Sequence, residues 1–478
     1  MAVNGENTAT SGTSSTMSAG VIHPFRRRPA KTNTRMPSPI KRPWIKSESP
    51  LGRILQNTAW LLGGKGVGAI LSLGYLAIVT RTLGPSGFGH FALILSTAQA
   101  ISTIVSFESW QVIVKYGQEH LREGDGGKLG RLVGFCIAID IAGALTGCAI
   151  AAAAALLLGP HFGWSSAMSM QAVAYCAVIL LTIRSTPTGL LRLFDRFDAG
   201  ALAETMIPIA RMAGAVIAWL ASPGITAFLI AWAAAELVCA VTYWSLALKT
   251  AKDRLGRWSR ASFLQARHEN AGIMSFLTAT NLSTTVSSLS KQLSVLLVGF
   301  FVGAAGAGLY RLAHQLSNSL TKISGLLSRA IFAELAKVHA GQNEKDVRKL
   351  FRRTNRLAII AGAIIIMLIL TLGKPLLLLM AGPAFGGAYP LLLLLGIAAS
   401  IDLVGVSFEP LLMATGHPRS IVAIRLLNAL FLLAALAVLL PRLGATGAAT
   451  SNMIVAVTGF LMMGAAARHY SRKKRGAA

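Results

Sequence analysis

The sequence predicts an all-α polytopic membrane protein with about twelve transmembrane helices, in two six-helix halves around a central cavity. Three observations support this prediction. First, 54% of the 478 residues are hydrophobic and only 13% are charged, whereas about 25% is usual in soluble domains. Second, apolar runs of about 20 residues, the length that crosses a bilayer, recur along the whole chain. Third, runs such as LAIIAGAIIIMLIL are continuous, which disfavours the alternating strands of a transmembrane barrel.

The predicted spans follow one another with short connections. They are 54–79, 91–114, 132–158, 168–191, 199–221, 224–248, 279–302, 309–333, 357–380, 389–414, 420–440 and 445–467. Residues 54–248 then form the N-terminal half and residues 279–467 the C-terminal half. Residues 249–278 are a cytoplasmic connector, and residues 1–53 and 468–478 are basic cytoplasmic tails. The first tail is rich in Ser, Thr, Pro and Arg, so we expect it to be disordered, and Met36 is a possible alternative start.

The net charge of +27 is distributed in a way that predicts the topology rather than a nucleic-acid partner. With both termini cytoplasmic, the inner segments contain 34 Lys and Arg residues and the outer loops contain two, Arg81 and Arg442. Cytoplasmic loops of membrane proteins carry such an excess. The sequence therefore predicts a multi-pass protein of a bacterial inner membrane with both ends inside.

An internal repeat supports the division into halves. GPSGFGHF, residues 84–91 after the first span, matches GAAGAGLY, residues 303–310 after the seventh, at an offset of 219. In the helices that follow, Gln99 is in step with Asn318 and Ser102 with Thr321. Six helices per half would relate the halves by an axis along the membrane normal. The alternatives are chance similarity and two tight turns that use the conformational freedom of glycine.

Ionisable and polar residues inside the spans are the candidate functional residues, because charges in a bilayer are costly and usually face a bundle interior or water. Thr280, Thr284, Ser287, Ser288 and Lys291 recur every three or four residues along one helical face. A second stripe contains Gln315, Asn318 and Lys322. The predicted substrate-binding cavity residues are Lys291, Lys322, Lys65, Arg211, Arg184, Ser287, Thr284, Gln315, Asn318 and Gln99.

Simpler interpretations stay open for these residues. Hydroxyl groups can hydrogen-bond across helices, intramembrane cations can pair with acids, Arg184 can extend to the interface, and glycines beside Lys65 can pack helices closely. The four cysteines lie in spans without a CxxC pair, so neither a disulfide framework nor a metal site is expected. We find no phosphate-loop or HExxH motif, and we expect no cofactor and no enzyme activity.

The segments RTLGPSGFGHFAL and GAAGAGLYRLAHQLSNSL, with twelve helices and a basic connector, resemble the Wzx-type polysaccharide flippases. These belong to the superfamily shared with MATE multidrug exporters and lipid II flippases. The resemblance covers residues 51–470. Lipid II flippases typically have fourteen helices, so the predicted count disfavours that branch.

The resemblance implies translocation of an undecaprenyl-diphosphate-linked oligosaccharide to the periplasmic face by alternating access. The cavity cations would then hold the diphosphate, and the hydroxyl and amide groups would meet the sugar. Membrane lipids and polysaccharide polymerase or export proteins are the expected partners. The family is thought to use ion gradients, for which Glu108, Glu204 and Asp402 are candidates here. The alternatives are a MATE-like drug exporter and a membrane polymerase or ligase for the same glycans.

Overall fold

The computed structural model describes residues 50–252, 263–340, 344–409, 412 and 418–473. Within these ranges some side chains are outside the description: those of residues 50–67, 158, 263–264, 279, 282–284, 286–287, 290–291, 320–340, 344–354, 357, 418–419 and 470–473. The chain divides into residues 1–56, of which only the start of the first helix is described, and residues 57–478. The contacts below lie within residues 57–478.

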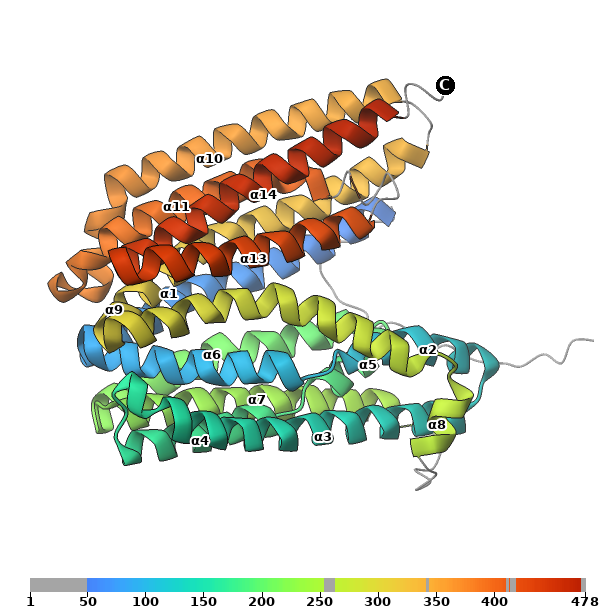
Figure 1. Cartoon of the computed structure of the whole chain (residues 1–478). Helices are drawn as coiled ribbons and strands as arrows, with labels where there is room; N and C mark the ends of the chain where they lie inside the picture. The colour runs from blue at the N-terminus through green and yellow to red at the C-terminus, as the bar shows by residue number, and fades with distance from the viewer. Residues whose placement is uncertain (1–49, 253–262, 341–343, 410–411, 413–417, 474–478) are drawn as a thin grey trace, which may run out of the picture. The chain divides into compact units, whose positions relative to one another are not determined.

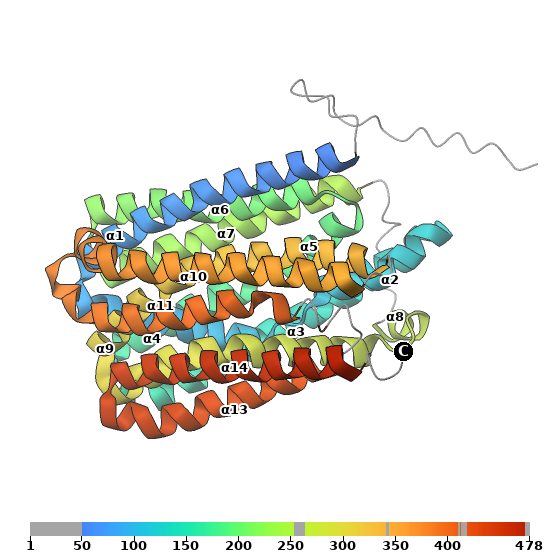
Figure 2. The ribbon, with the colours of Figure 1, turned by 90° about the horizontal axis from the view of Figure 1, so that it is seen from above.

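Every element in the described ranges is helical, as the continuous apolar runs predict. The first part comprises α1 (Pro50–Val105), α2 (Ser109–Glu123), α3 (Gly126–Leu158), η1 (Pro160–Phe162), α4 (Ser166–Leu181), α5 (Ser185–Leu193), α6 (Phe197–Ala221), α7 (Ile225–Ala251) and α8 (Phe263–Glu269). The second part comprises α9 (Ile273–Ala340), α10 (Glu344–Ala381), η2 (Pro383–Ala388), α11 (Tyr389–Val404), η3 (Gly405–Ser407), α13 (Pro418–Leu443) and α14 (Ala445–Lys473). The long helices run side by side (Figures 1 and 2).

Helices α1 and α9 each contain a turn that divides them into two helical segments, which we call the first and second legs. Gly84 in α1 has φ 65° and ψ 179°, and Gly303 in α9 has φ 85° and ψ 179°. Only glycine adopts such angles readily, as the tight-turn interpretation of the two motifs expects. Ten helices in the described part of the chain are long and apolar enough to cross a membrane. The multi-span helical architecture is therefore confirmed, while the count of twelve stays a prediction.

Two predicted spans are interrupted. The span 91–114 breaks at residues 106–108, between α1 and α2, and the span 168–191 breaks at residues 182–184, between α4 and α5. The two breaks are joined, because the backbone N–H of Trp110 donates to Ser185 Oγ at 3.1 Å. The residues at the two breaks, SFE and TIR, include neither Gly nor Pro.

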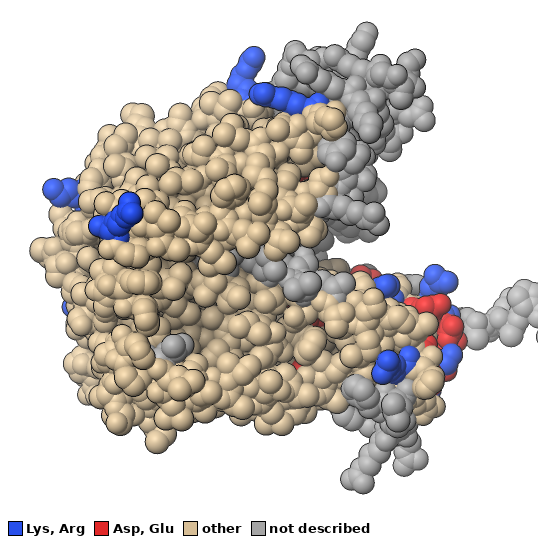
Figure 3. All heavy atoms as spheres, in the orientation of Figure 1, with Lys and Arg blue, Asp and Glu red and all other residues tan. Residues whose placement is uncertain are grey.

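Five turns with a glycine at positive φ define one end of the bundle, which we call the glycine end: Gly84, Gly163, Gly303, Gly382 and Gly444. The largest buried cluster connects helices there, and Phe88 of α1 meets Phe385 of η2 with ring centroids 6.0 Å apart. Large apolar side chains such as Leu156, Leu220 and Leu379 are exposed. In Figure 3 the charged side chains lie mainly at the ends of a mostly uncharged surface, which suits contact with lipid.

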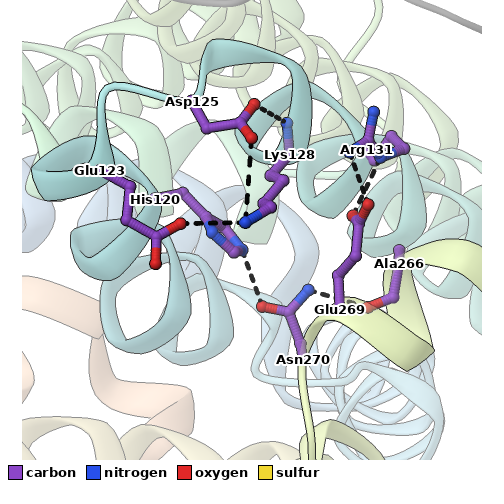
Figure 4. A network of polar contacts seen from close by, with 8 residues as sticks. All are labelled: His120, Glu123, Asp125, Lys128, Arg131, Ala266, Glu269 and Asn270. Atoms are coloured by element: carbon purple, nitrogen blue, oxygen red, sulfur yellow. Dashed lines mark hydrogen bonds and ion pairs between the residues drawn. The ribbon is translucent and has the colours of Figure 1, made fainter.

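A polar network at the opposite end fixes the connector between the predicted halves (Figure 4). We call it the connector network. Arg131 of α3 binds Glu269 of α8 through two hydrogen bonds of 2.9 and 2.5 Å, and His120 Nε2 of α2 lies 2.9 Å from Asn270 Oδ1. At the edge of this network, the backbone N–H of Lys128 donates to Asp125, which holds the pKa of Asp125 below its usual value. Helix α8 is thereby held against α2 and α3.

The basic segment between the predicted spans 309–333 and 357–380 is partly helical and belongs to a long element. Residues 344–356 form the start of α10, which continues to Ala381 without a break. The side chains of residues 344–354 lie outside the described part of the chain.

Candidate functional site

Two arginines share one buried carboxylate near the middle of the helix pair α6 and α7. Arg211 Nη2 of α6 lies 2.7 Å from Glu236 Oε1 of α7, and Arg184 Nη1, at the start of α5, lies 2.9 Å from Glu236 Oε2. The side chain of Glu236 is only 8% exposed. Both arginines therefore form ion pairs with an acid, which is one of the simpler interpretations of intramembrane cations. Arg184 is thus ion-paired and is not a free cation at the membrane interface.

Aromatic rings position Arg211 from the other side. Its guanidinium lies 5.4 Å from the ring of Trp232, and Trp232 is held edge-on between Tyr75 and Phe91 of α1, at centroid distances of 5.1 and 5.3 Å. A cation over an aromatic face is stabilised by about 0.5–2 kcal/mol. Because Trp232 is fixed by two rings, Arg211 has little freedom to move away.

A third arginine comes from α9, in the predicted C-terminal half. Arg311 lies close enough to Arg211 for their charges to repel. Arg311 Nη1 donates a long hydrogen bond of 3.5 Å to Gln292 Oε1. We call Arg184, Arg211, Arg311 and Glu236 the arginine cluster. Arg311 was not singled out in the sequence because it lies only two residues inside the predicted span 309–333.

The arginine cluster has unused capacity for an anion. It contains three guanidinium groups and one carboxylate, and Glu204, the next acid near Arg184, is exposed and accepts a hydrogen bond from Tyr243 Oη at 3.0 Å. Arg211 Nε is buried and has no hydrogen-bond partner in the described part of the chain. Guanidinium groups bind carboxylates and phosphates through paired hydrogen bonds. The geometry therefore suits an anionic ligand better than a cationic one.

A second polar group lies at the two helix breaks. Asp140 of α3 is buried, and its Oδ2 accepts hydrogen bonds from Ser109 Oγ at 2.9 Å and Thr186 Oγ1 at 2.6 Å. These hydroxyls stand at the starts of α2 and α5, where helix dipoles favour negative charge. Asp140 thus joins both interrupted helices, a role that spacing along its own helix does not reveal.

The structure brings only part of the predicted cavity together. Arg184 and Arg211 meet at Glu236, and Asn318 lies beside His314, with Asn318 Nδ2 3.0 Å from His314 Nδ1. Gln99 and Gln315 are half-buried on α1 and α9. The other predicted cavity residues have side chains outside the described part: Lys65, Thr284, Ser287, Lys291 and Lys322. Their roles stay predictions.

The three ion-coupling candidates lie on different elements. Glu108 caps the start of α2 and accepts a hydrogen bond from the indole N–H of Trp110. Glu204 is on α6, and Asp402 is exposed on α11. Glu108 lies close enough to Asp140 for the two charges to interact.

Polar residues of the first leg of α9 also bind α1. Asn281 Nδ2 donates to the Ser106 carbonyl at 2.8 Å, and Thr285 Oγ1 donates to the Thr103 carbonyl at 3.0 Å. Both acceptor carbonyls lie at the C-terminal end of α1, where the helix has no further N–H groups to bond them. Asn281 and Thr285, which lie beside the predicted polar stripe and are not part of it, therefore bind between helices.

Comparison with known proteins places the chain in a family. Residues 54–339, more than half of the sequence, match the family model described as "Polysaccharide biosynthesis protein". The chain belongs to this family. It is also 30% identical over 344 residues to "Inner membrane protein YghQ" of Escherichia coli (strain K12), a match that covers 71% of this chain and 95% of that protein.

Solved transporters share the fold of this family member. An inward-facing multidrug resistance MATE transporter of the MOP superfamily matches with a TM-score of 0.67 and 13% identity, over 85% of this chain and 96% of its own. The lipid II flippase MurJ, in an inward closed conformation, matches with 0.68 and 12%, over 85% and 86%. At such identities the likeness concerns the fold. It confirms the predicted class of a polytopic helical membrane protein.

Proposed function

We propose that the protein is a Wzx-type flippase of a bacterial inner membrane. Its passenger would be an undecaprenyl-diphosphate-linked oligosaccharide repeat unit, moved to the periplasmic face for polysaccharide biosynthesis. Membership of the polysaccharide biosynthesis family and a fold shared with MurJ support this proposal. It is a transport function, without a chemical step.

The observation that best supports the proposal is the excess of guanidinium groups in the arginine cluster. A diphosphate carries two or more negative charges, and three arginines with one carboxylate leave a local excess of positive charge. Arg211 and Arg311 come from opposite predicted halves, so an anion between them would relieve their repulsion. Further positive charge would come from Lys65, Lys291 and Lys322. The sugar hydroxyls would hydrogen-bond to Thr284, Ser287, Gln315, Asn318 and Gln99.

Alternating access would expose the arginine cluster to each side in turn. Energy would come from an ion gradient acting on an intramembrane carboxyl. Glu108, Glu204 and Asp402 remain the proposed coupling residues, and the contacts of Asp140 add it to that set. Partner proteins would be the polymerase or export components that use the translocated unit, and both termini would be cytoplasmic.

The decisive experiment measures lipid-linked repeat units in a deletion strain. We expect complete units to accumulate on the cytoplasmic face, as determined by mass spectrometry with a glycan label applied from one side of the membrane. Complementation with Arg211→Gln or Arg311→Gln should lower export roughly tenfold or more, because a hydrogen bond to a charged group contributes about 1.5–3 kcal/mol.

Arg425→Gln is the matched control, since Arg425 is also intramembrane but is 47% exposed and pairs with Glu409. It should export normally at equal protein level. Units that reach the periplasm normally in the deletion strain would contradict the flippase proposal. If that strain instead became sensitive to cationic compounds, the drug-exporter alternative would replace it.

A further inference from the structure

The two glycine motifs lie against each other at the glycine end, and their contacts are reciprocal. Position six of each motif meets position two of the other: Gly89 faces the Ala304 carbonyl, and Gly308 faces the Pro85 carbonyl. Both motifs begin with a glycine in the same conformation, at Gly84 and Gly303. The sequence repeat therefore corresponds to an approximate two-fold contact between the second legs of α1 and α9.

This contact depends on the absence of side chains. A Cβ atom added to Gly89 would lie 1.7 Å from the Ala304 oxygen, and one added to Gly308 would lie 2.3 Å from the Pro85 oxygen. Both distances are far below van der Waals contact, and the obstructing atoms are backbone. Small residues allow helices in membranes to approach in this way. An alanine at either position would force the two legs apart.

Other contacts close the same end around the crossing. Arg81 of α1 donates from Nε to the Met380 carbonyl at the end of α10, at 3.1 Å. The ring of His161 in η1 stacks on Phe300 of α9, with centroids 5.7 Å apart. Each contact joins an element of residues 54–248 to one of residues 279–467. The crossing is thus the central contact of an interface between the two predicted halves.

We propose that this reciprocal crossing, Gly89 against Ala304 and Gly308 against Pro85, is the closing contact of the outer gate. Contacts between Cα–H groups and carbonyl oxygens are individually weak, so the gate can close tightly and still open at low cost. The role of this contact as a gate rests on the proposed transport function. The closure of this end needs no passenger, so it is tested on the passenger-free protein.

The experiment measures the distance between Ser222 and Arg442 by double electron–electron resonance of spin labels in nanodiscs. Both residues are exposed near the glycine end, in opposite predicted halves. The four native cysteines are first replaced, and size-exclusion and thermal profiles establish that each variant is folded. We expect Gly89→Ala and Gly308→Ala to raise the long-distance population roughly tenfold, as overpacking of a tight contact requires. Gly134→Ala and Gly200→Ala are matched controls, because an added Cβ meets nothing within 4 Å there.

A second readout covers the case in which a labelled variant does not fold. In a variant with His161→Cys and Phe300→Cys, crosslinking in whole membranes should be efficient, and it should be weaker when Gly89→Ala is added. Wild-type distances or undiminished crosslinking in the glycine variants would overturn the gate proposal. Neither readout uses a passenger, so a failure of the gate proposal can be told apart from a failure of the flippase proposal. In the second case the gate can be intact although nothing is exported.

Discussion

At the scale of single residues, Glu236 is the group on which the arginine cluster depends. It balances two guanidinium groups inside a helix bundle, where an uncompensated charge is costly. Arg184 and Arg211 approach different oxygens of the same carboxylate. Removing the carboxylate therefore affects both partners at once.

We expect Glu236→Gln to destabilise the protein by about 3–5 kcal/mol, the usual cost of leaving a buried charge without its partner. Arg184→Gln should cost less, because the Arg184 side chain is 36% exposed and Arg211 still pairs with Glu236. Thermal unfolding in detergent measures both variants. Equal stability of Glu236→Gln and the parent protein would show that the shared ion pair does not stabilise this fold.

At the scale of elements, α8 links the two predicted halves and is attached to one of them. The connector network binds it to α2 and α3, while Gly272, with φ +78°, separates it from α9. Ile273 and Leu277, at the start of α9, are buried in the same cluster as residues of α2, α3 and α5. In the proposed alternating access, the end of the connector and the start of α9 would therefore move with the N-terminal helices.

We expect Glu269→Gln to release α8, because it weakens the paired hydrogen bonds from Arg131. These groups are 20% and 16% exposed, so a loss of about 1–2 kcal/mol is reasonable. Hydrogen exchange of residues 263–270 should then quicken roughly 5- to 30-fold. Glu123→Gln, which removes a more exposed pair with Lys128, should leave that exchange unchanged; equal effects would contradict the attachment of α8 through Glu269.

At the scale of the whole molecule, the distribution of basic residues predicts which end faces the cytoplasm. The glycine end contains Arg81 and Arg442, the two basic residues of the predicted outer loops, while the connector network lies at the opposite end. The positive-inside rule therefore predicts that the glycine end faces outside.

Single cysteines at exposed positions test this orientation. A cysteine at Ser222 or Arg442 should react with a membrane-impermeant maleimide in intact spheroplasts, whereas one at Asp198 should react only after lysis. The reverse pattern would invert the topology, and with it the direction of the proposed transport and the assignment of the gate as outer.

The sequence alone determined the class of protein, because bilayer thickness fixes the length of an apolar helix. It also predicted the two glycine turns, because only glycine readily adopts their backbone angles. Arg184 and Arg211 could be selected as intramembrane cations because they lie inside predicted spans. Their shared partner Glu236, the neighbouring Arg311 and the hydroxyl donors of Asp140 could not, since helical spacing predicts neighbours on one helix but not on others. The crossing of Gly89 and Gly308 was likewise decided only in the tertiary structure, where two distant turns bring their backbones into contact.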